Sequence, residues 1–313
     1  MPPCSSLMVV GGGVMGQGIA RLFSGAGIAV TLVEPREITF SHPGVTVVRQ
    51  MPAAPVPELV IEAVFEDRDV KQAVYADVER LYEGRPVLAT NTSGLPLDEL
   101  AAPLRYPERF LAMHFFMPAD VFPMIEVVRG ARTEEAAVTA AVAAVEQAGR
   151  EPILLQRAVN GYLINRLQHA ILHEAYHLLA DGIATAEMID SVATRLLGPR
   201  LCVTGLLKQK DMAGLGMHAQ AQRSIVPTLS HTGIPSPFLQ DMVARGDVGV
   251  RSGKGFYQWS GQDAADMQRR ANARLQRLLA FLEREAQADA ASDAGNDPGK
   301  YAASTVPGGD SAR

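Results

Sequence analysis

The chain has 313 residues, of which 47% are hydrophobic and 20% charged, and its net charge at pH 7 is −5; these values are ordinary for a soluble protein of about two domains. No block of basic residues is present, so neither nucleic acid nor an anionic membrane is an expected partner. With two cysteines, no apolar run of membrane-spanning length and no signal-peptide pattern, the sequence predicts a cytoplasmic protein without a disulfide framework.

The start of the chain has the pattern of a dinucleotide-binding unit. Residues 6–10 form an apolar run, and Gly11, Gly13 and Gly16 follow it in the G-x-G-x-x-G spacing, before a helical run and a second apolar strand. Gly11 permits the tight turn, Gly13 lets the backbone approach a pyrophosphate, and Gly16 lets the helix pack closely on the strand. This order predicts a dinucleotide site, and a glycine-rich turn in another parallel α/β fold is the alternative.

The two ends of this unit predict how a cofactor would be held. The backbone N–H groups of the first helical turn, at Val14 and Met15, would face the phosphates at the positive end of the helix dipole. Glu34 lies 18 residues after Gly16, where a carboxylate can hold the adenosine ribose hydroxyls. This acid favours NAD, while Arg36, two residues further on, keeps NADP open as an alternative.

Beyond Glu34, short apolar strands alternate with helices. Strands are predicted at 45–48, 59–64, 86–90, 110–116, 124–128 and 152–155, and helices at 69–82 and 133–149. Thr133 is the predicted N-cap of the last of these helices. The alternation predicts an α/β fold, a Rossmann-type doubly wound and mostly parallel sheet, over residues 1–159.

After residue 160 the strand signals nearly vanish. Helices are predicted at 161–180, 186–197, 217–226, 237–245 and 264–286. The sequence therefore predicts an all-helical C-terminal domain over 160–286, with a substrate-binding and dimerisation role. Residues 287–313 are rich in Ala, Asp, Gly, Ser and Pro, and we expect them to form a disordered tail.

A second group of candidate residues lies where two consecutive strands meet. His114 ends one predicted strand, and Glu126 lies in the next. Ligands of open α/β sheets bind at the carboxyl ends of the strands, and a histidine beside a carboxylate is a suitable general base. The alternative is a core histidine that happens to lie near a glutamate.

From about residue 7 to residue 259 the chain resembles the L-3-hydroxyacyl-CoA dehydrogenase family. The shared motifs, in the family's order, are the E-x-x-x-x-K pair (Glu66 and Lys71), an N-T-S turn (91–93), the H-F-F-N-P histidine with a glutamate twelve residues later (His114 and Glu126), a P-G-F-x-x-N-R segment (160–166) and a closing G-K-G-F-Y segment (253–257). Several motifs in the same order make the resemblance specific.

The resemblance implies a homodimeric enzyme of fatty acid metabolism that oxidises a 3-hydroxyacyl thioester reversibly with NAD. His114 would take the proton of the substrate hydroxyl, and Glu126 would orient its imidazole. Ser93 and Asn165 would hold the substrate oxygen while hydride leaves the same carbon for the nicotinamide.

Three more residues are expected, by the same resemblance, beside the nicotinamide half of the cofactor. They are Glu66, Lys71 and Asn91. If the resemblance held only for the fold, the chain would be a non-catalytic NAD-binding relative. The presence of all four candidate catalytic residues argues against that alternative.

Two departures from the family pattern concern the substrate. The family has a helical excursion that contacts coenzyme A after the second strand, but here only 24 residues, five of them proline, separate Glu34 from Leu59. Met117 replaces the asparagine of H-F-F-N-P, which predicts a more apolar pocket. The alternative substrates are therefore a carrier-protein-bound acyl group or a small hydroxy acid without CoA.

One further motif predicts a different chemistry. His173, Glu174 and His177 fit the H-E-x-x-H pattern of zinc hydrolases, and His169 lies one helical turn earlier. Because the surrounding chain matches a dehydrogenase, we expect these side chains to line a helix face and to bind no metal. Zinc hydrolysis stays a remote alternative.

Overall fold

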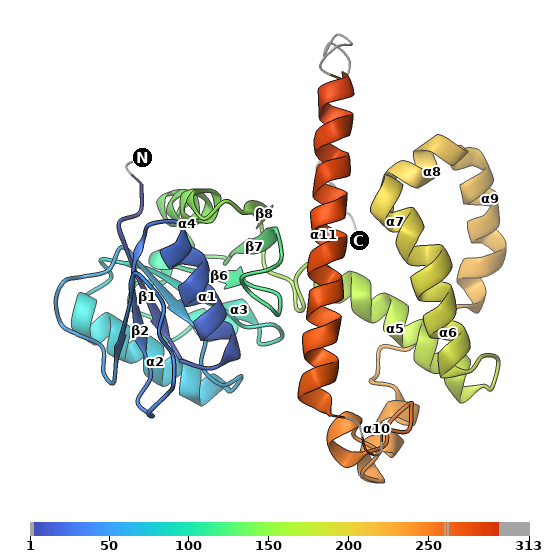
Figure 1. The fold of residues 1–313 in the computed structure, drawn as a ribbon, viewed down its shortest axis with the longest axis horizontal. Coiled ribbons are helices and arrows are strands. Elements are labelled where there is room, and N and C mark those ends of the chain that lie inside the picture. Colours follow the sequence, from blue (N-terminus) through green and yellow to red (C-terminus); the bar gives the residue numbers. More distant parts are fainter. Residues whose placement is uncertain (1–2, 260, 262, 294–313) are drawn as a thin grey trace, which may run out of the picture. The chain divides into compact units, whose positions relative to one another are not determined.

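The computed structural model describes residues 3–259, 261 and 263–293 and contains an eight-stranded sheet in the order β3-β2-β1-β4-β5-β6-β7-β8 (Figure 1). The strands are β1 (Ser6–Val10), β2 (Ala29–Val33), β3 (Val45–Val48), β4 (Leu59–Glu62), β5 (Val87–Thr90), β6 (Phe110–His114), β7 (Met124–Arg129) and β8 (Glu151–Leu155). Every neighbouring pair is parallel except β6 and β7. The predicted doubly wound, mostly parallel sheet is confirmed.

Helices cover both faces of this sheet. They are α1 (Val14–Gly25), α2 (Arg68–Tyr82), α3 (Leu97–Ala101) and α4 (Glu135–Gln147). Because side chains alternate along a strand, Leu7 and Val9 pack into the core with α1 and α4, whereas Met8 and Val10 pack into the core with α2 and α3. The central strands β4, β5 and β6 are thus buried on both sides, which explains their nearly continuous apolar runs.

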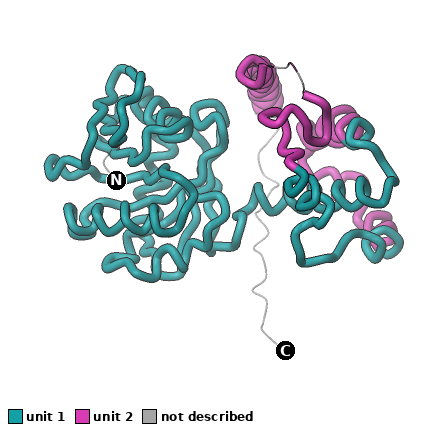
Figure 2. The backbone as a smooth tube through the Cα atoms, turned by 90° about the horizontal axis from the view of Figure 1, so that it is seen from below, with its two compact units in different colours: residues 1–189, 223–245 teal, residues 190–222, 246–313 magenta. Residues whose placement is uncertain are grey.

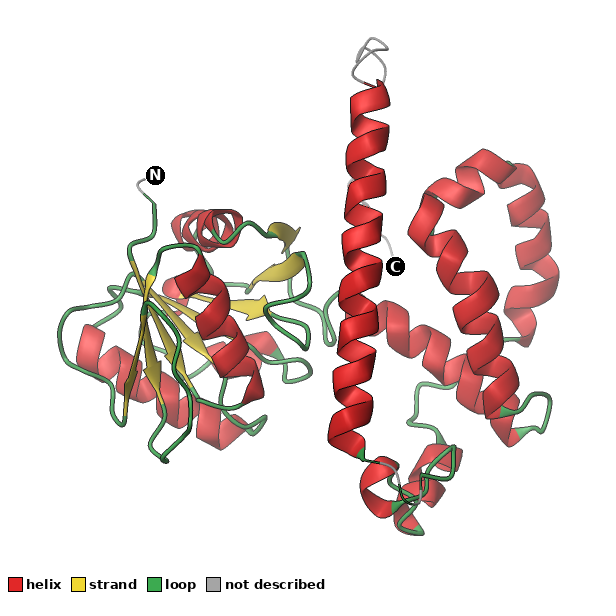
Figure 3. Cartoon of the chain, in the orientation of Figure 1, coloured by secondary structure: helices red, strands yellow, loops and turns green. Residues whose placement is uncertain are grey.

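The segment after β8 is helical. It contains α5 (Ile164–Ala180), α6 (Ala186–Val192), a π-helical turn (Ala193–Leu197), α7 (Gly198–Thr204), α8 (Lys208–Ala213), α9 (Leu215–Ile225), α10 (Pro237–Ala244) and α11 (Ala264–Asp293) (Figure 3). Within its described residues the only β pairing is two isolated bridges around Lys254. None of the helices in the described ranges combines the length and hydropathy that a membrane crossing requires.

Backbone contacts divide the chain into two units, 1–189 with 223–245, and 190–222 with 246–313 (Figure 2). The predicted domain boundary at 159/160 stays a prediction. Helix α11 extends to Asp293, so residues 287–293 of the predicted tail are helical, and its remainder, 294–313, lies outside the described residues.

Some local predictions were wrong. Helix α4 begins at Glu135 with Glu134 as its N-cap, and Thr133 does not cap it. Thr133 is instead buried, where its hydroxyl accepts a hydrogen bond from Gly130 N (2.9 Å) and donates to the Phe110 carbonyl. The short helices α3, α7 and α8 were not predicted, because five to seven residues are too few to show a helical period.

Two glycines fix the turn between β1 and α1. Gly11 has a φ of +110°, and a Cβ there would lie 2.6 Å from the Ala63 carbonyl oxygen. A Cβ on Gly16 would lie 1.8 Å from the Gly11 carbonyl oxygen. The glycines at these two positions are therefore required by backbone packing alone.

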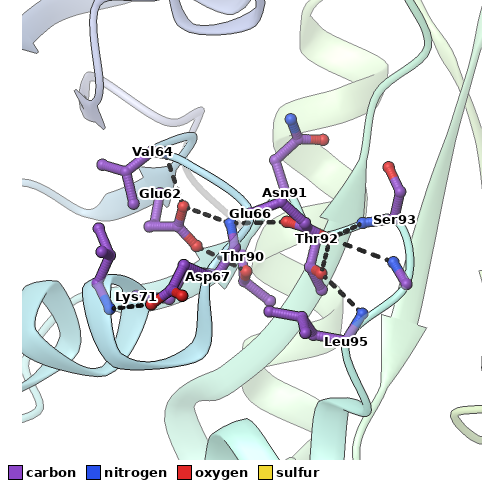
Figure 4. A network of polar contacts seen from close by, with 12 residues as sticks. Glu62, Val64, Glu66, Asp67, Lys71, Thr90, Asn91, Thr92, Ser93 and Leu95 are labelled. Carbon is purple, nitrogen blue, oxygen red and sulfur yellow. Dashed lines mark hydrogen bonds and ion pairs between the residues drawn. The ribbon is translucent and has the colours of Figure 1, made fainter. Parts of the chain in front are cut away.

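A buried ion pair joins β4 to α2 beneath the carboxyl edge of the sheet (Figure 4). Lys71 Nζ lies 2.7 Å from Glu62 Oε1, and both side chains are completely buried. The other carboxylate oxygen of Glu62 accepts hydrogen bonds from the hydroxyls of Tyr75 (2.9 Å) and Thr90 (2.7 Å). Each buried charge thus has an opposite charge and polar partners, which burial requires.

Gly16→Ala should lower the free energy of unfolding in urea by roughly 3 kcal/mol or more, because the backbone of the turn must move to admit the new methyl group. Gly25→Ala, in the same helix, is the matched control, since its Cβ meets no atom within 4 Å. It should stay within about 1 kcal/mol of wild type. Equal stability of the two variants would contradict the packing described here.

Lys71→Met should lower the free energy of unfolding by about 3–5 kcal/mol, because the Glu62 carboxylate is left buried without its counter-ion. The matched control is Arg80→Met in the same helix, whose exposed guanidinium lies 2.8 Å from Asp77 Oδ1. Loss of that pair should change the same quantity by no more than about 1 kcal/mol. Similar costs for the two variants would contradict the role of burial.

Candidate active site

A cavity of about 960 Å³ opens at the carboxyl edge of the sheet, above the β1–α1 turn. Five of the predicted cofactor residues line it, namely Gly11, Gly13, Val14, Met15 and Glu34. A Cβ on Gly13 would meet no protein atom within 4 Å, so packing within the protein does not require glycine there, whereas the close approach of a phosphate would. Gly13 is also the N-cap of α1 and provides no side-chain cap, which leaves the first N–H groups available to an anion. The residues that line this cavity therefore fit the adenosine and pyrophosphate part of a dinucleotide.

Glu34 lines this cavity, and both of its carboxylate oxygens accept hydrogen bonds. Oε2 accepts from Gly12 N (2.9 Å) and Arg36 Nη2 (3.2 Å), and Oε1 accepts from Arg36 N (3.1 Å) and Arg36 Nε (2.7 Å). The hydrogen bond from the Arg36 guanidinium lowers the pKa of Glu34 to about 2, against the opposing effect of burial. Glu34 is therefore ionised at any physiological pH.

The predicted His–Glu pair forms across the antiparallel strands β6 and β7, where His114 lies directly opposite Glu126. His114 Nδ1 lies 2.7 Å from Glu126 Oε2, and both side chains are buried. With the proton on Nδ1, the other ring nitrogen, Nε2, is left as an acceptor. The antiparallel return of β7 brings Glu126 to the edge where β6 ends.

The start of α5 holds the other oxygen of Glu126. Oε1 accepts hydrogen bonds from Leu163 N (2.9 Å) and Ile164 N (3.0 Å). Burial raises the pKa of Glu126, but the hydrogen bonds from His114 and from these two N–H groups outweigh it, and the pKa is lowered. The carboxylate is thus kept ionised and fixed in orientation beside the imidazole.

Ser93 and Asn165 lie on the open side of the histidine. Ser93 Oγ lies 3.0 Å from His114 Nε2, and Asn165 Nδ2 donates to the Ser93 carbonyl oxygen (3.3 Å). The rings of Phe116 and Tyr162 flank the imidazole, with centroids 5.0 Å and 5.4 Å from its own. The structure thus brings together all four predicted catalytic residues, from four separate segments of the chain.

Glu66 holds the turn that carries Ser93 (Figure 4). Its Oε1 accepts from Ser93 N (2.9 Å), Gly94 N (3.2 Å) and the Thr92 hydroxyl, and its Oε2 lies 3.2 Å from Lys71 Nζ. Burial alone would raise the pKa of Glu66. The Thr92 hydrogen bond and the Lys71 charge outweigh burial, so the pKa of Glu66 is lowered. The predicted E-x-x-x-x-K pair therefore positions the serine.

Four of the predicted cofactor residues do not line the cavity: Gly16, Glu66, Lys71 and Asn91. Lys71 is fully buried, and the Asn91 side chain accepts a hydrogen bond from Phe115 N (3.0 Å). Sequence reasoning missed Glu62, which anchors Lys71. The sequence feature that could have indicated Glu62 is a single acidic residue at the end of an apolar strand, nine residues before a lysine in the next helix.

The H-E-x-x-H residues have other partners. His173 Nε2 lies 2.9 Å from Thr232 Oγ1, Glu174 Oε2 accepts from Ser230 N (2.8 Å), and His177 Nδ1 lies 3.8 Å from Asp181 Oδ2. Among the residues that the structure describes, no group of three or more His, Cys, Asp or Glu side chains could hold a metal ion.

The segment between β2 and β4 is the place where the family resemblance predicts a helical excursion that contacts coenzyme A. Residues 35–58, all of them described, contain β3 and no helix. The helical excursion that the resemblance leads one to expect is therefore missing from this part of the chain.

Comparison with known proteins gives close relatives of two kinds. The chain is 28% identical to a 5-formyl-3-hydroxy-2-methylpyridine 4-carboxylate 5-dehydrogenase of Mesorhizobium japonicum, over 88% of this chain and 91% of the relative. It is 32% identical to a 3-hydroxybutyryl-CoA dehydrogenase of Mycobacterium tuberculosis, over 80% and 96%. A crystal structure of a dehydrogenase with the first of these activities, described as an NAD+-dependent dismutase, superposes with a TM-score of 0.83 at 25% identity, covering 90% of this chain and 99% of that one.

Family models match both parts of the chain. The NAD-binding domain of 3-hydroxyacyl-CoA dehydrogenase matches residues 6–54 and 42–158, and its C-terminal domain matches residues 161–259. Together these matches cover most of the chain, including every residue of the candidate site. The chain belongs to the 3-hydroxyacyl-CoA dehydrogenase family and is an NAD-dependent oxidoreductase that acts on CH–OH groups.

Proposed function

We propose that this protein catalyses the reversible NAD-linked oxidation of a small hydroxyl compound that carries no coenzyme A, with His114 as the general base. The observation that supports this most is the continuous chain from Glu126 through His114 to Ser93, with distances of 2.7 Å and 3.0 Å. This hydrogen-bonded chain ends at the Ser93 hydroxyl, next to His114 Nε2, where a substrate oxygen can form hydrogen bonds with both residues.

The roles follow from these contacts. His114 Nε2 takes the proton of the substrate hydroxyl, and Glu126 fixes the tautomer and stabilises the imidazolium that forms. Ser93 Oγ donates to the substrate oxygen, and Asn165 orients the segment that carries this serine. NAD, when bound, supplies the acceptor for the hydride that leaves the carbinol carbon. In the reverse direction His114 returns the proton to the carbonyl oxygen.

Two observations support a substrate without coenzyme A. Residues 35–58 contain no helix, so the family's contact for the coenzyme A tail has no counterpart among these described residues. A solved structure that superposes on this chain with a TM-score of 0.83 belongs to a dehydrogenase named for a pyridine carboxylate.

Two aromatic rings near the base suit a planar substrate. Phe116 lies beside His114, and its ring centroid is 5.9 Å from that of Phe122, which gives such a substrate aromatic edges to pack against.

A 3-hydroxyacyl thioester, on CoA or on a carrier protein, is the second candidate substrate, with a place in fatty acid metabolism. It is favoured by the 32% identity to a 3-hydroxybutyryl-CoA dehydrogenase. The chemistry at His114 is the same for both candidates, and only the group bonded to the carbinol carbon differs.

Nicotinamide absorbance distinguishes these substrates. With NADH and acetoacetyl-CoA or S-acetoacetyl pantetheine, we expect KM values within about threefold of each other, because coenzyme A gains no extra contacts. With NADH and 5-formyl-3-hydroxy-2-methylpyridine 4-carboxylate, whose formyl group would accept the hydride and a proton and become a hydroxymethyl group, we expect a higher kcat/KM than with acetoacetyl-CoA. A KM for the CoA ester far below that for the pantetheine ester would show a working coenzyme A site and overturn the substrate proposal.

His114→Ala should lower kcat by about 10²–10⁴-fold on whichever substrate turns over, because the general base is lost. Glu126→Gln should also lower kcat, since the neutral amide cannot stabilise an imidazolium. His42→Ala is the control, because His42 contacts Ser24 and belongs to neither the site nor the cavity. NADH binding should persist in all three variants, and full activity of His114→Ala would overturn the proposed mechanism.

We also propose that the protein is a homodimer that pairs through helices α7–α9. Large apolar side chains are exposed there, including Val203 (82%), Leu207 (78%) and Met212 (70%). Val203 and Met212 line one surface pocket, and exposed apolar side chains that gather in this way mark protein interfaces.

Light scattering should therefore give twice the monomer mass for the wild type. The double variant Val203→Glu with Leu207→Glu should give the monomer mass, because each contact would bury a charge. Arg223→Glu, on the same helical segment, is the control and should leave the mass unchanged. A monomeric wild type would overturn this proposal.

A further inference from the structure

The carboxylate that should select NAD is already saturated by the protein's own donors. Glu34 accepts four hydrogen bonds, three from Arg36 and one from Gly12 N. A carboxylate has about four lone-pair positions, so each is in use. The ribose hydroxyls that normally donate to such an acid therefore gain less from Glu34 while Arg36 is bound to it.

The Arg36 guanidinium also neutralises the charge that would exclude a 2′-phosphate. Only Nε and Nη2 contact Glu34, and a guanidinium has five N–H donors, so one edge of the group is left for another acceptor. The side chain is 78% exposed and lines the cavity. A planar cation with an open edge beside Glu34 is suited to a phosphate.

A second cation, Arg49, lines the same cavity. Strands β2 and β3 are paired in parallel with Val33 opposite Val48, so Glu34 and Arg49 are the next residues on adjacent strands. Arg49 lines the cavity, and its nearest ion-pair partner is Glu37, with Nη2 and Oε2 4.0 Å apart and both side chains largely exposed. Such a distant, solvated pair leaves most of the Arg49 charge available to a ligand.

The remaining charged groups of the cavity balance each other. Asp77 and Arg80 both line it, and they form an ion pair at 2.8 Å on α2. With Glu34 paired to Arg36 and Asp77 paired to Arg80, the cavity has a net excess of positive charge at Arg49.

We propose that this protein binds NADP(H) as well as NAD(H), and that Arg36 and Arg49 form the subsite for the 2′-phosphate. Arg36 is then a specificity-determining residue with two effects. It shields the phosphate from Glu34, and it withholds Glu34 from the hydroxyls of an unphosphorylated ribose.

Fluorescence titration with NADH and NADPH tests this directly, because it requires no substrate and is independent of the reaction proposed above. For the wild type we expect the two dissociation constants to lie within about tenfold of each other. In Arg36→Ala the constants should move in opposite directions. NADPH should bind about tenfold or more weakly, having lost a charge-assisted contact and met a bare carboxylate, while NADH should bind equally well or more tightly.

Two further variants complete the test. Arg49→Ala should weaken NADPH more than NADH, because NADH carries no 2′-phosphate for that side chain to bind. Arg80→Ala removes the same charge from the same cavity, away from Glu34, and should leave the ratio of the two constants unchanged. A wild-type ratio above about tenfold overturns the proposal, and so does an Arg36→Ala variant that weakens both cofactors equally.

Discussion

The buried carboxylate of Glu126 is the group on which the rest of the site depends. Its two oxygens join three elements, since one faces the imidazole on β6 and the other takes two N–H groups at the start of α5. A buried charge is tolerated only where such partners surround it. The same contacts that make the burial of Glu126 acceptable also fix His114, so stability and function share one set of hydrogen bonds.

Glu66 has a parallel task at the turn that carries Ser93. It is held by Lys71 from beneath, and in turn it holds the backbone N–H groups of Ser93 and Gly94. One carboxylate thus positions the base and another positions the hydroxyl. Both have lowered pKa values, so their hydrogen bonds persist over the range in which a histidine changes its charge.

The sequence predicts the architecture well because glycine spacing and strand alternation are local signals. It also identifies His114 and Glu126, although it does not show that β7 runs antiparallel to β6, which is what places the two residues face to face. Pairing direction depends on the whole sheet and has no local signature. The buried role of Glu62 was missed for a similar reason, since its partner is defined by how α2 packs on β4.

Errors at single residues have a different origin. Thr133 has a good N-cap composition, but its hydroxyl is used by Gly130 and Phe110 in the tertiary structure. The sequence also shows that Arg36 follows Glu34 by two residues. It does not show that the Arg36 guanidinium donates hydrogen bonds to both oxygens of the Glu34 carboxylate, because that depends on side-chain geometry.

The contact between Glu126 and α5 also sets an order of events during synthesis. All residues that line the cofactor cavity lie between Val10 and Leu81, whereas the N–H groups that fix Glu126 belong to Leu163 and Ile164. A growing chain has therefore produced every wall of its nucleotide cavity long before it can orient its base. On the ribosome, the residues that line this cavity are complete first, and the base can be fixed only after the first turn of α5 has emerged.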